Sequence, residues 1–305
     1  MNRQPVNRRT TAPDADAAPD PAGAARVERA GALTTVQDDG RPGLAHLGVP
    51  RSGALDTAAH HLANRLVGNE EGAAVLETTL DGVSLRLERA TTVAVTGAQA
   101  AVSVDGAPSD WGLPVHVPAG ATVDVGPALS GVRSYLAVAG GLAADRVLGS
   151  ASTDLLSGLG PAPLVTGDVL RIGAPTAPAP AVDLAPYRPP PHEIELAIRL
   201  GPRHDWLSAA GVATLDEGTW SVSTDSNRIA LRLSGPPVER SRNDELPSEG
   251  LVLGAIQSLP DGELVVFLAD HPTTGGYPVV AVVDRASLDA CAQARPGSLV
   301  RFRRG

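Results

Sequence analysis

A polar loop near the C-terminal end of the chain carries residues that can do acid–base chemistry. Residues 269–278 read ADHPTTGGYP and separate two apolar runs. An adjacent carboxylate and imidazole can move protons, hydroxyl groups can donate hydrogen bonds, and paired glycines let the backbone approach a ligand closely. We therefore expect a site here, although Gly-Gly is also an ordinary hairpin signal. The expected catalytic residues are Asp270, His271 and Tyr277, and the expected substrate contacts are Thr273, Thr274, Gly275 and Gly276.

A second polar block, residues 34–56, lies near the other end of the chain. Free backbone N–H groups at a helix start, with two arginines nearby, favour an anion. The structural alternatives are an Asx-type turn with a surface salt bridge, and an N-cap role for Ser52. The expected substrate-binding residues of this block are Gln37, Asp38, Arg41, Arg51, Ser52 and Asp56. We expect part of the block to share one concave site with Asp270, His271, Thr274 and Tyr277.

Further polar residues interrupt apolar segments. Glu77 lies in an otherwise apolar strand, and a buried carboxylate there needs a partner, for which an arginine would serve. Arg228, Glu249 and Gln257 in the second half are expected pocket residues that contact substrate. The alternative for these three is that they brace turns or form buried hydrogen-bonded pairs.

The histidines and the cysteine do not predict a metal site. His60 and His61 are adjacent on a predicted helix, so they project about 100° apart. No His-x-x-x-His or Cys-x-x-Cys spacing occurs. Cys291 falls on the apolar face of another predicted helix and is expected to be inert core.

Composition excludes several classes of function. The 305 residues carry a formal net charge of −9, which argues against nucleic-acid and anionic-membrane partners. The chain has no lysine, so it cannot supply the lysine of a Walker phosphate loop, of a pyridoxal Schiff base or of a biotin attachment site. One cysteine cannot form an internal disulfide, and this fits a cytoplasmic protein. No apolar run approaches the roughly 18 residues of a membrane span.

Short apolar runs between Gly, Pro and Asp signals predict many short strands and few helices. The clearest helical periodicity covers residues 53–67, and a second helix is expected over 287–294. We expect a disordered Pro- and Ala-rich tail at residues 1–25, an N-terminal β subdomain at 26–173, a Pro-rich linker at 174–192 and a C-terminal β subdomain at 193–305.

Several spaced motifs occur together in this chain. They are TTVQDDGRPG at 34–43, GVPRSGALD at 48–56, ANRLVGN at 63–69, RSYLAVAGG at 133–141, LPSEG at 246–250 and GAIQ at 254–257. Together they resemble the family that contains the C subunit of 5-oxoprolinase, KipA and biotin-dependent carboxyltransferases such as allophanate hydrolase subunit 2. The resemblance implies a mainly β fold with cyclophilin-like β-barrel architecture in two subdomains and few helices. Asn227 departs from the Asp that this family commonly has before the arginine.

The resemblance implies three alternative functions. The first is a subunit of ATP-dependent 5-oxoprolinase, which opens 5-oxo-L-proline to L-glutamate together with partner subunits of the A and B types. ATP would then bind at the level of the complex rather than clearly on this chain. The second is a biotin-dependent carboxyltransferase subunit that acts on urea or a related amide, with biotin on a separate carrier protein. The third is a KipA-like regulatory binding protein.

Overall fold

The structure, a computed structural model, describes residues 21–181, residue 187 and residues 189–305. Most of the tail expected for residues 1–25 lies outside the described residues. Residues 21–25, however, belong to strand β1 (Pro21–Arg29), which pairs with two other strands. The expectation that these five residues are disordered is therefore wrong. Ala25 and Val27 are fully buried on one face of β1, because strand residues two apart share a face.

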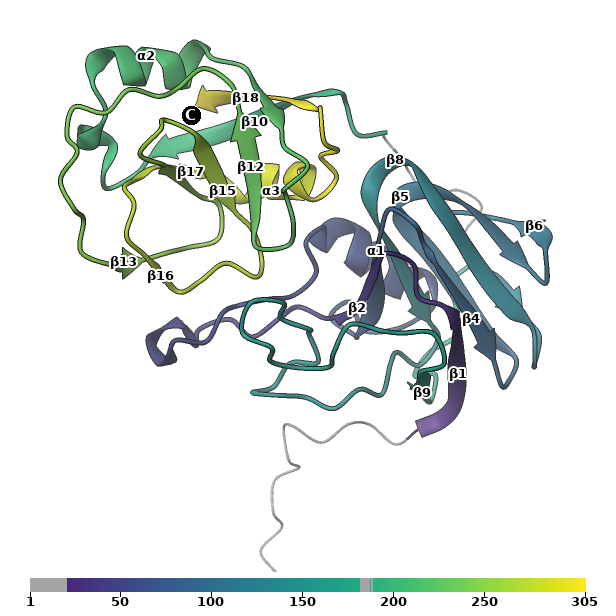
Figure 1. The fold of residues 1–305 in the computed structure, drawn as a ribbon. Coiled ribbons are helices and arrows are strands. Elements are labelled where there is room, and N and C mark those ends of the chain that lie inside the picture. The colour runs from purple at the N-terminus through teal and green to yellow at the C-terminus, as the bar shows by residue number, and fades with distance from the viewer. Residues whose placement is uncertain (1–20, 182–186, 188) are drawn as a thin grey trace, which may run out of the picture.

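The N-terminal half forms one curled antiparallel sheet (Figure 1). Its strands run in the order β2-β3-β8-β4-β1-β9, and β5 also pairs with β6, β7 and β8. Buried Val, Leu and Ala side chains on the concave face fill its core. After β1, the strand bounds are β2 (Leu33–Gln37), β3 (Val75–Thr79), β4 (Val83–Leu87), β5 (Thr91–Val104), β6 (Ala107–Ser109), β7 (Val115–Val117), β8 (Thr122–Val138) and β9 (Val169–Gly173).

Helix α1 (Thr57–Leu66) packs against β5 and β8 through Ala59, Ala63 and Leu66, which confirms the helix expected there. The expected N-cap, Ser52, is wrong. Asp56 caps the helix instead, because its side chain accepts a hydrogen bond from Ala59 N at 2.9 Å. Ser52 lies before the helix with φ of 54°, and its side chain hydrogen-bonds to Thr153 O and Asp270 Oδ1 instead.

The C-terminal half closes into a barrel in the order β10-β17-β14-β15-β12-β11-β18. Its strand pairs are antiparallel except for β10 with β18. The strand bounds are β10 (Glu193–Leu200), β11 (Trp220–Val222), β12 (Ala230–Ser234), β14 (Ala255–Ser258), β15 (Leu264–Phe267), β17 (Val279–Val283) and β18 (Leu299–Arg304). The expected mainly β, barrel-based architecture is confirmed.

Two further helices lie against the barrel. Helix α3 (Arg285–Ala292) confirms the second expected helix, which begins two residues earlier than predicted. Helix α2 (Ala209–Glu217) was not predicted, because its nine residues include only two that are buried and so give little periodic signal. The remaining elements are the 3₁₀ turns η1 (Ala45–Leu47) and η2 (His204–Trp206) and the two-residue strands β13 (Glu249–Gly250) and β16 (Thr274–Gly275).

The polar loop 269–278 is not a hairpin turn. Strand β14 pairs with both β15 and β17, so the two strands that flank the loop are not neighbours. The loop crosses this end of the barrel and pairs there with β13 through β16. The loop therefore passes over the end of β14 instead of forming a tight reverse turn, and in this position its side chains can face the N-terminal half.

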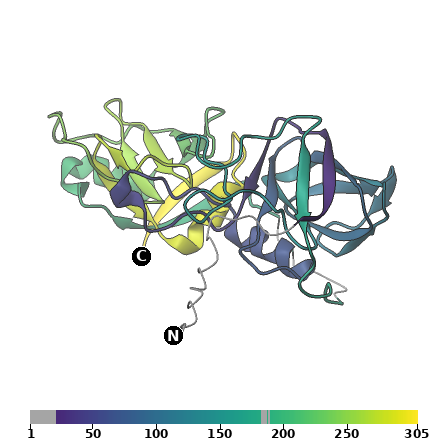
Figure 2. The same ribbon diagram turned by 90° about the horizontal axis from the view of Figure 1, so that it is seen from below.

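The sheet and the barrel lie side by side, and the segment between β2 and α1 leaves the sheet and runs beneath the barrel (Figures 1 and 2). Among the described residues, no strand of the sheet pairs with a strand of the barrel. We therefore propose the subdomain boundary at residues 174–192, between β9 and β10. In the described part of the chain, no helix combines the length and apolar character needed to cross a membrane.

Candidate functional site

A buried ion network joins the sheet to the barrel. The Arg228 guanidinium donates to Asp270 from Nε at 2.9 Å and from Nη2 at 3.0 Å, and it also donates to Glu77 from the opposite subdomain. Arg133 Nε lies 3.6 Å from Glu77 Oε1. These four residues, which we call the buried network, are 5% exposed or less. The expectation that Glu77 meets an arginine is confirmed.

The neighbours of Glu77 complete its hydrogen bonding. Tyr135 Oη donates to Glu77 Oε2 at 2.8 Å, and Leu55 N donates to the same oxygen at 3.0 Å. Burial opposes ionisation of Glu77, but Arg228 and Arg133 outweigh it and lower its pKa below the usual range. Glu77 is therefore an ionised carboxylate whose role is to bind the two halves together.

The two polar blocks meet at Ser52. Ser52 Oγ lies 2.7 Å from Thr153 O and 3.0 Å from Asp270 Oδ1, and Ser52 N donates to Ala269 O at 3.0 Å. Gly40 packs so closely that a Cβ there would lie 2.6 Å from the carbonyl oxygens of residues 51 and 52. The expected approach of the 34–56 block to the 269–278 loop is therefore confirmed as a contact.

A cleft opens beside this contact. It consists of two adjoining cavities, of about 320 and 370 Å³, a volume typical of small-ligand pockets. Both cavities are lined by Arg51 and Arg285, and the larger is also lined by Arg41 and His271. We call these four residues the cleft residues. Arg41 and Arg51 come from the segment beneath the barrel, His271 from the loop and Arg285 from the start of α3.

The arginines of the cleft form no ion pair within the described chain, although nearby carboxylates act on them electrostatically. Arg41 Nη2 donates to Ser152 O at 2.7 Å, but its buried Nη1 has no hydrogen-bond partner. For Arg51 and Arg285, no side-chain hydrogen bond or ion pair forms with any described residue. Burial, and then the nearby charge of Arg285, lower the pKa of Arg51. Neighbouring guanidinium groups whose donors have no direct partner favour an anionic ligand.

His271 supplies a proton acceptor in the same cleft. Its Nδ1 lies 2.7 Å from Pro272 O, and a carbonyl oxygen only accepts, so Nδ1 carries the proton and Nε2 the lone pair. Burial lowers the pKa of His271, which keeps the ring neutral near neutral pH. A neutral imidazole with a fixed tautomer is suited to accept a proton from a bound substrate.

Other expected site residues have structural partners. Asp38 accepts hydrogen bonds from Ser150 Oγ, Ser152 Oγ, Ala151 N and Gly40 N. Gln37 donates to Thr35 Oγ1 and Thr153 O, Asp56 caps α1, and Arg228 with Asp270 belongs to the buried network. Asn227, the departure from the family motif, accepts from the backbone of the following turn.

Tyr277 does not reach the cleft. It is 45% exposed and lines a different cavity of about 860 Å³, together with Arg240, Trp206 and Gly276. Arg240 is already bonded to Ser258 O, so we place the ligand site in the smaller cleft, where the cations lack partners. The expected single site for Asp270, His271, Thr274 and Tyr277 is therefore divided.

Of the other expected contacts, Thr273 lines the cleft, while Thr274 and Gly275 form β16. Glu249 forms an ion pair with Arg203, and Gln257 donates to Tyr277 O at 2.9 Å. Sequence analysis did not find Arg285. In the sequence, Arg285 is marked only by its place just before the second predicted helix. Its position opposite Arg51 depends on tertiary packing, which local sequence does not show.

The chain is similar to known proteins over most of its length. Residues 47–304 match the family model for the carboxyltransferase domain, subdomains A and B. The C subunit of 5-oxoprolinase from Escherichia coli (strain K12) is 35% identical over 282 residues, which cover 91% of this chain and 90% of that protein. The urea amidolyase of Lachancea kluyveri is 34% identical over 305 residues, which cover 90% of this chain but 16% of that protein.

Solved structures show the same fold. The protein TTHA0988 superposes with a TM-score of 0.83 at 38% identity, over 93% of this chain and 56% of that one. The urea amidolyase of K. lactis superposes with a TM-score of 0.86 at 31% identity, over 93% of this chain and 19% of that one. The chain thus spans nearly the whole of the Escherichia coli protein, but only part of these longer proteins.

Proposed function

Because this chain belongs to the family of carboxyltransferase domains with subdomains A and B, we propose that it is the C-type subunit of an ATP-dependent 5-oxoprolinase. Such an enzyme opens the lactam ring of 5-oxo-L-proline to give L-glutamate. Two relatives named as the C subunit of 5-oxoprolinase, from Escherichia coli and Haemophilus influenzae, match this chain along about nine-tenths of their own length. We infer that it acts with partner subunits of the A and B types.

The observation that carries this proposal is the cleft with unpaired arginines. The substrate 5-oxoproline carries a carboxylate, and a guanidinium binds a carboxylate through two parallel hydrogen bonds. Arg51 and Arg285 line both cavities of the cleft and have no carboxylate partner among the described residues, so we assign them to the substrate carboxylate. Arg41 Nη1 provides a further donor deeper in the same cleft.

We assign proton transfer to His271. Hydrolysis of a lactam needs a base to activate the attacking water or to accept a proton from the tetrahedral intermediate. The free Nε2 of the neutral His271 ring can do this beside a substrate that Arg51 holds in the same cleft. Asp270, expected to be catalytic, instead takes a positioning role, because both its oxygens are bonded to Arg228.

We place ATP-dependent activation of the lactam on the partner subunits. Activation of a stable amide by ATP supplies the driving force for ring opening. The lysine-free chain supplies no phosphate-loop lysine of its own, and we assign its part to orienting the substrate and stabilising negative charge.

A second candidate is biotin-dependent carboxyl transfer, which is favoured by the similarity to two fungal urea amidolyases. Carboxybiotin also carries a carboxylate that the cleft arginines could bind. In that case biotin would arrive on a separate carrier protein. Urea itself has no carboxylate, so in this second case Arg51 and Arg285 would be needed to bind carboxybiotin and not to bind urea.

Co-expression with the products of neighbouring genes, followed by purification of the complex, tests these proposals. We expect ADP and glutamate to form only when 5-oxoproline is present and only in the complete complex. The isolated chain should show no turnover. Biotin-dependent carboxylation of urea by the complex would overturn the first candidate in favour of the second. A stable complex without either activity would favour the regulatory alternative.

A further inference from the structure

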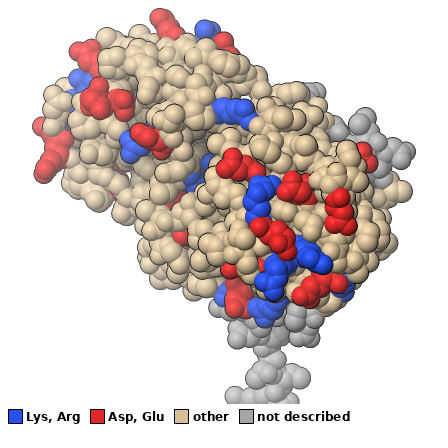
Figure 3. Space-filling view, turned by 45° about the vertical axis from the view of Figure 1, so that its right-hand side comes forward, with Lys and Arg blue, Asp and Glu red and all other residues tan. Residues whose placement is uncertain are grey.

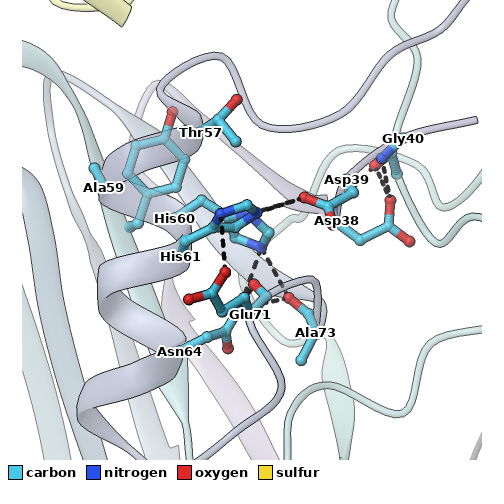
Figure 4. A network of polar contacts seen from close by, with 12 residues as sticks. Asp38, Asp39, Gly40, Thr57, Ala59, His60, His61, Asn64, Glu71 and Ala73 are labelled. Carbon is cyan, nitrogen blue, oxygen red and sulfur yellow. Dashed lines mark hydrogen bonds and ion pairs between the residues drawn. The ribbon is translucent and has the colours of Figure 1, made fainter. Parts of the chain in front are cut away.

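Two histidines and a carboxylate converge near the start of α1 (Figure 4). His60 and His61 are consecutive in α1, and Asp39 lies in the segment that follows β2. His61 Nε2 lies 2.7 Å from Asp39 Oδ1, and His60 Nδ1 lies 3.8 Å from the same oxygen. One ligand atom from each residue falls within 4.8 Å of the others.

His60 directs a lone pair at this cluster. Its Nε2 lies 2.8 Å from Ala73 O, and at that distance the nitrogen must donate, because two lone pairs would repel each other. In the neutral ring, Nδ1 is therefore the unprotonated nitrogen. The ring is fully buried, and Nδ1 has no hydrogen-bond partner. A buried acceptor nitrogen is thus left unsatisfied.

The distances suit a transition-metal ion. Zinc binds imidazole nitrogen and carboxylate oxygen at about 2.0–2.2 Å, which places ligand atoms of a tetrahedral site roughly 3.3–3.6 Å apart. The two observed separations, 2.7 and 3.8 Å, lie on either side of this range. Loss of the proton between His61 and Asp39 and a small side-chain rotation would bring all three atoms to bonding distance.

Each histidine also has an outer partner of the kind that metal ligands use. A histidine ligand usually donates its other N–H to a carbonyl or carboxylate, which fixes the tautomer. Ala73 O has this role for His60, and Glu71 Oε2, 3.6 Å from His61 Nδ1, can take it for His61. Gly72 gives Asp39 the necessary room, because a Cβ at residue 72 would lie 2.5 Å from Asp39 Oδ2.

We propose that Asp39, His60 and His61 form a binding site for a divalent transition-metal ion of the zinc type. The protein supplies three ligands, and the half-exposed Asp39 side leaves a coordination position for water or a ligand. Sequence analysis predicted no metal because it considered spacing within the helix alone. Here His60 uses Nδ1 and His61 uses Nε2, so adjacent rings reach one point, and the third ligand comes from another segment.

The metal site adjoins the cleft. His61 lines the same cavity as Arg51 and Asp289, and the charge of Asp39 acts on Arg51. A bound cation would engage the Asp39 carboxylate and add positive charge at the cleft edge, where we place the anionic substrate. The metal site itself rests on its own geometry and does not depend on the proposed reaction.

Metal titration of the full-length, chelator-treated chain tests this proposal. We expect one Co²⁺ or Zn²⁺ to bind per chain, measured by calorimetry and by the ligand-field absorption of Co²⁺, and excess Mg²⁺ should not compete. Binding should raise the melting temperature. His61→Ala and Asp39→Asn should each weaken the metal affinity about 10-fold or more.

His116→Ala is the matched control, because it removes an exposed imidazole from β7 at a distance from the cluster. It should bind the metal as the unmodified chain does. Asp39→Asn changes an exposed side chain and keeps the test valid if His61→Ala folds poorly. Absence of saturable one-to-one binding, or equal affinities in His61→Ala and His116→Ala, would overturn the proposal.

Discussion

The buried network and the cleft both gather arginines at the junction of sheet and barrel, but they differ in charge balance. In the buried network, Arg228 and Arg133 are matched by Glu77 and Asp270. In the cleft, Arg51 and Arg285 form no ion pair with a described residue, although the charges of Asp39 and Asp289 act on them, and the two guanidinium groups repel each other. Arginines that are ion-paired in the buried network hold the two halves together, whereas we propose that the cleft arginines, which lack a direct partner, bind a ligand.

The outer surface gives a third reference point. On the face in Figure 3, acidic and basic side chains lie interspersed over the N-terminal half. Exposed pairs such as Arg29 with Asp124 are solvated and contribute little, about 0–1 kcal/mol. The buried network and the cleft therefore differ in whether their arginines have direct acidic partners and in how deeply these are buried, and not simply in how many arginines they contain.

The largest effect should come from breaking the buried network. Arg228→Ala leaves Glu77 and Asp270 buried without their shared cation, which should lower the free energy of unfolding by about 3–5 kcal/mol. Arg199→Ala, which removes an exposed partner of Asp284, should change it by about 1 kcal/mol or less. Urea unfolding of both variants checks this, and similar losses in the two would contradict a special role for the network.

Asp56, beside the buried network, should make stability depend on pH. Burial raises its pKa from 3.8 to about 6, so the folded protein holds this proton more tightly than the unfolded chain. The stabilisation that comes from this proton is fully present below pH 3.8 and is lost as the pH rises to about 6. The loss lowers the free energy of unfolding by up to about 3 kcal/mol.

Asp56→Asn isolates this effect, because asparagine is an equally good N-cap and does not ionise. The difference in unfolding free energy between the two proteins should change in favour of the variant between pH 4 and pH 6. A difference that stays constant across this interval would show that Asp56 keeps an ordinary pKa.

In the cleft, His271→Ala should affect catalysis rather than folding. If His271 is the base, turnover by the complete complex should fall about 10²-fold or more, mainly in kcat, while the melting temperature changes little. His116→Ala serves as the control in the same assay. If His271 only braces the loop, the melting temperature should fall instead, and activity should follow the folded fraction.

The smallest expected effect is on substrate binding. Arg51→Ala should raise KM for 5-oxoproline about 10-fold or more, through loss of a charge-assisted hydrogen bond of roughly 1.5–3 kcal/mol. It should not destabilise the chain, because it also relieves repulsion with Arg285. Arg301→Ala, an exposed arginine paired with Glu193, is the control. Equal KM values in the two variants would remove Arg51 from the substrate site.

Local sequence patterns predicted many short strands and two helices because burial on one face imposes a period on the chain. The apolar run 279–283 coincides with β17, and the helical pattern of residues 53–67 contains α1. Helix α2 and the residue that caps α1 were missed. In α2 few residues are buried, and at the start of α1 both Ser52 and Asp56 are chemically able to cap.

Sequence also determined that Glu77 must have a cationic partner, since a carboxylate in an apolar strand cannot remain buried alone. It did not determine which arginine this is. Arg228 and Arg133 reach Glu77 from different segments, one of them in the other half of the molecule. With 25 arginines and no lysine in the chain, residue type could not distinguish them.

Tertiary structure alone separated the residues of the polar loop. Asp270 was drawn into the buried network, His271 faces the cleft, and Tyr277 lies exposed at another cavity. The same packing brought Arg285 to Arg51 and Asp39 to the two histidines of α1. Local periodicity records which side of an element is buried, but a polar side chain is satisfied equally well by many partners. Its partner is therefore decided only when distant segments pack together.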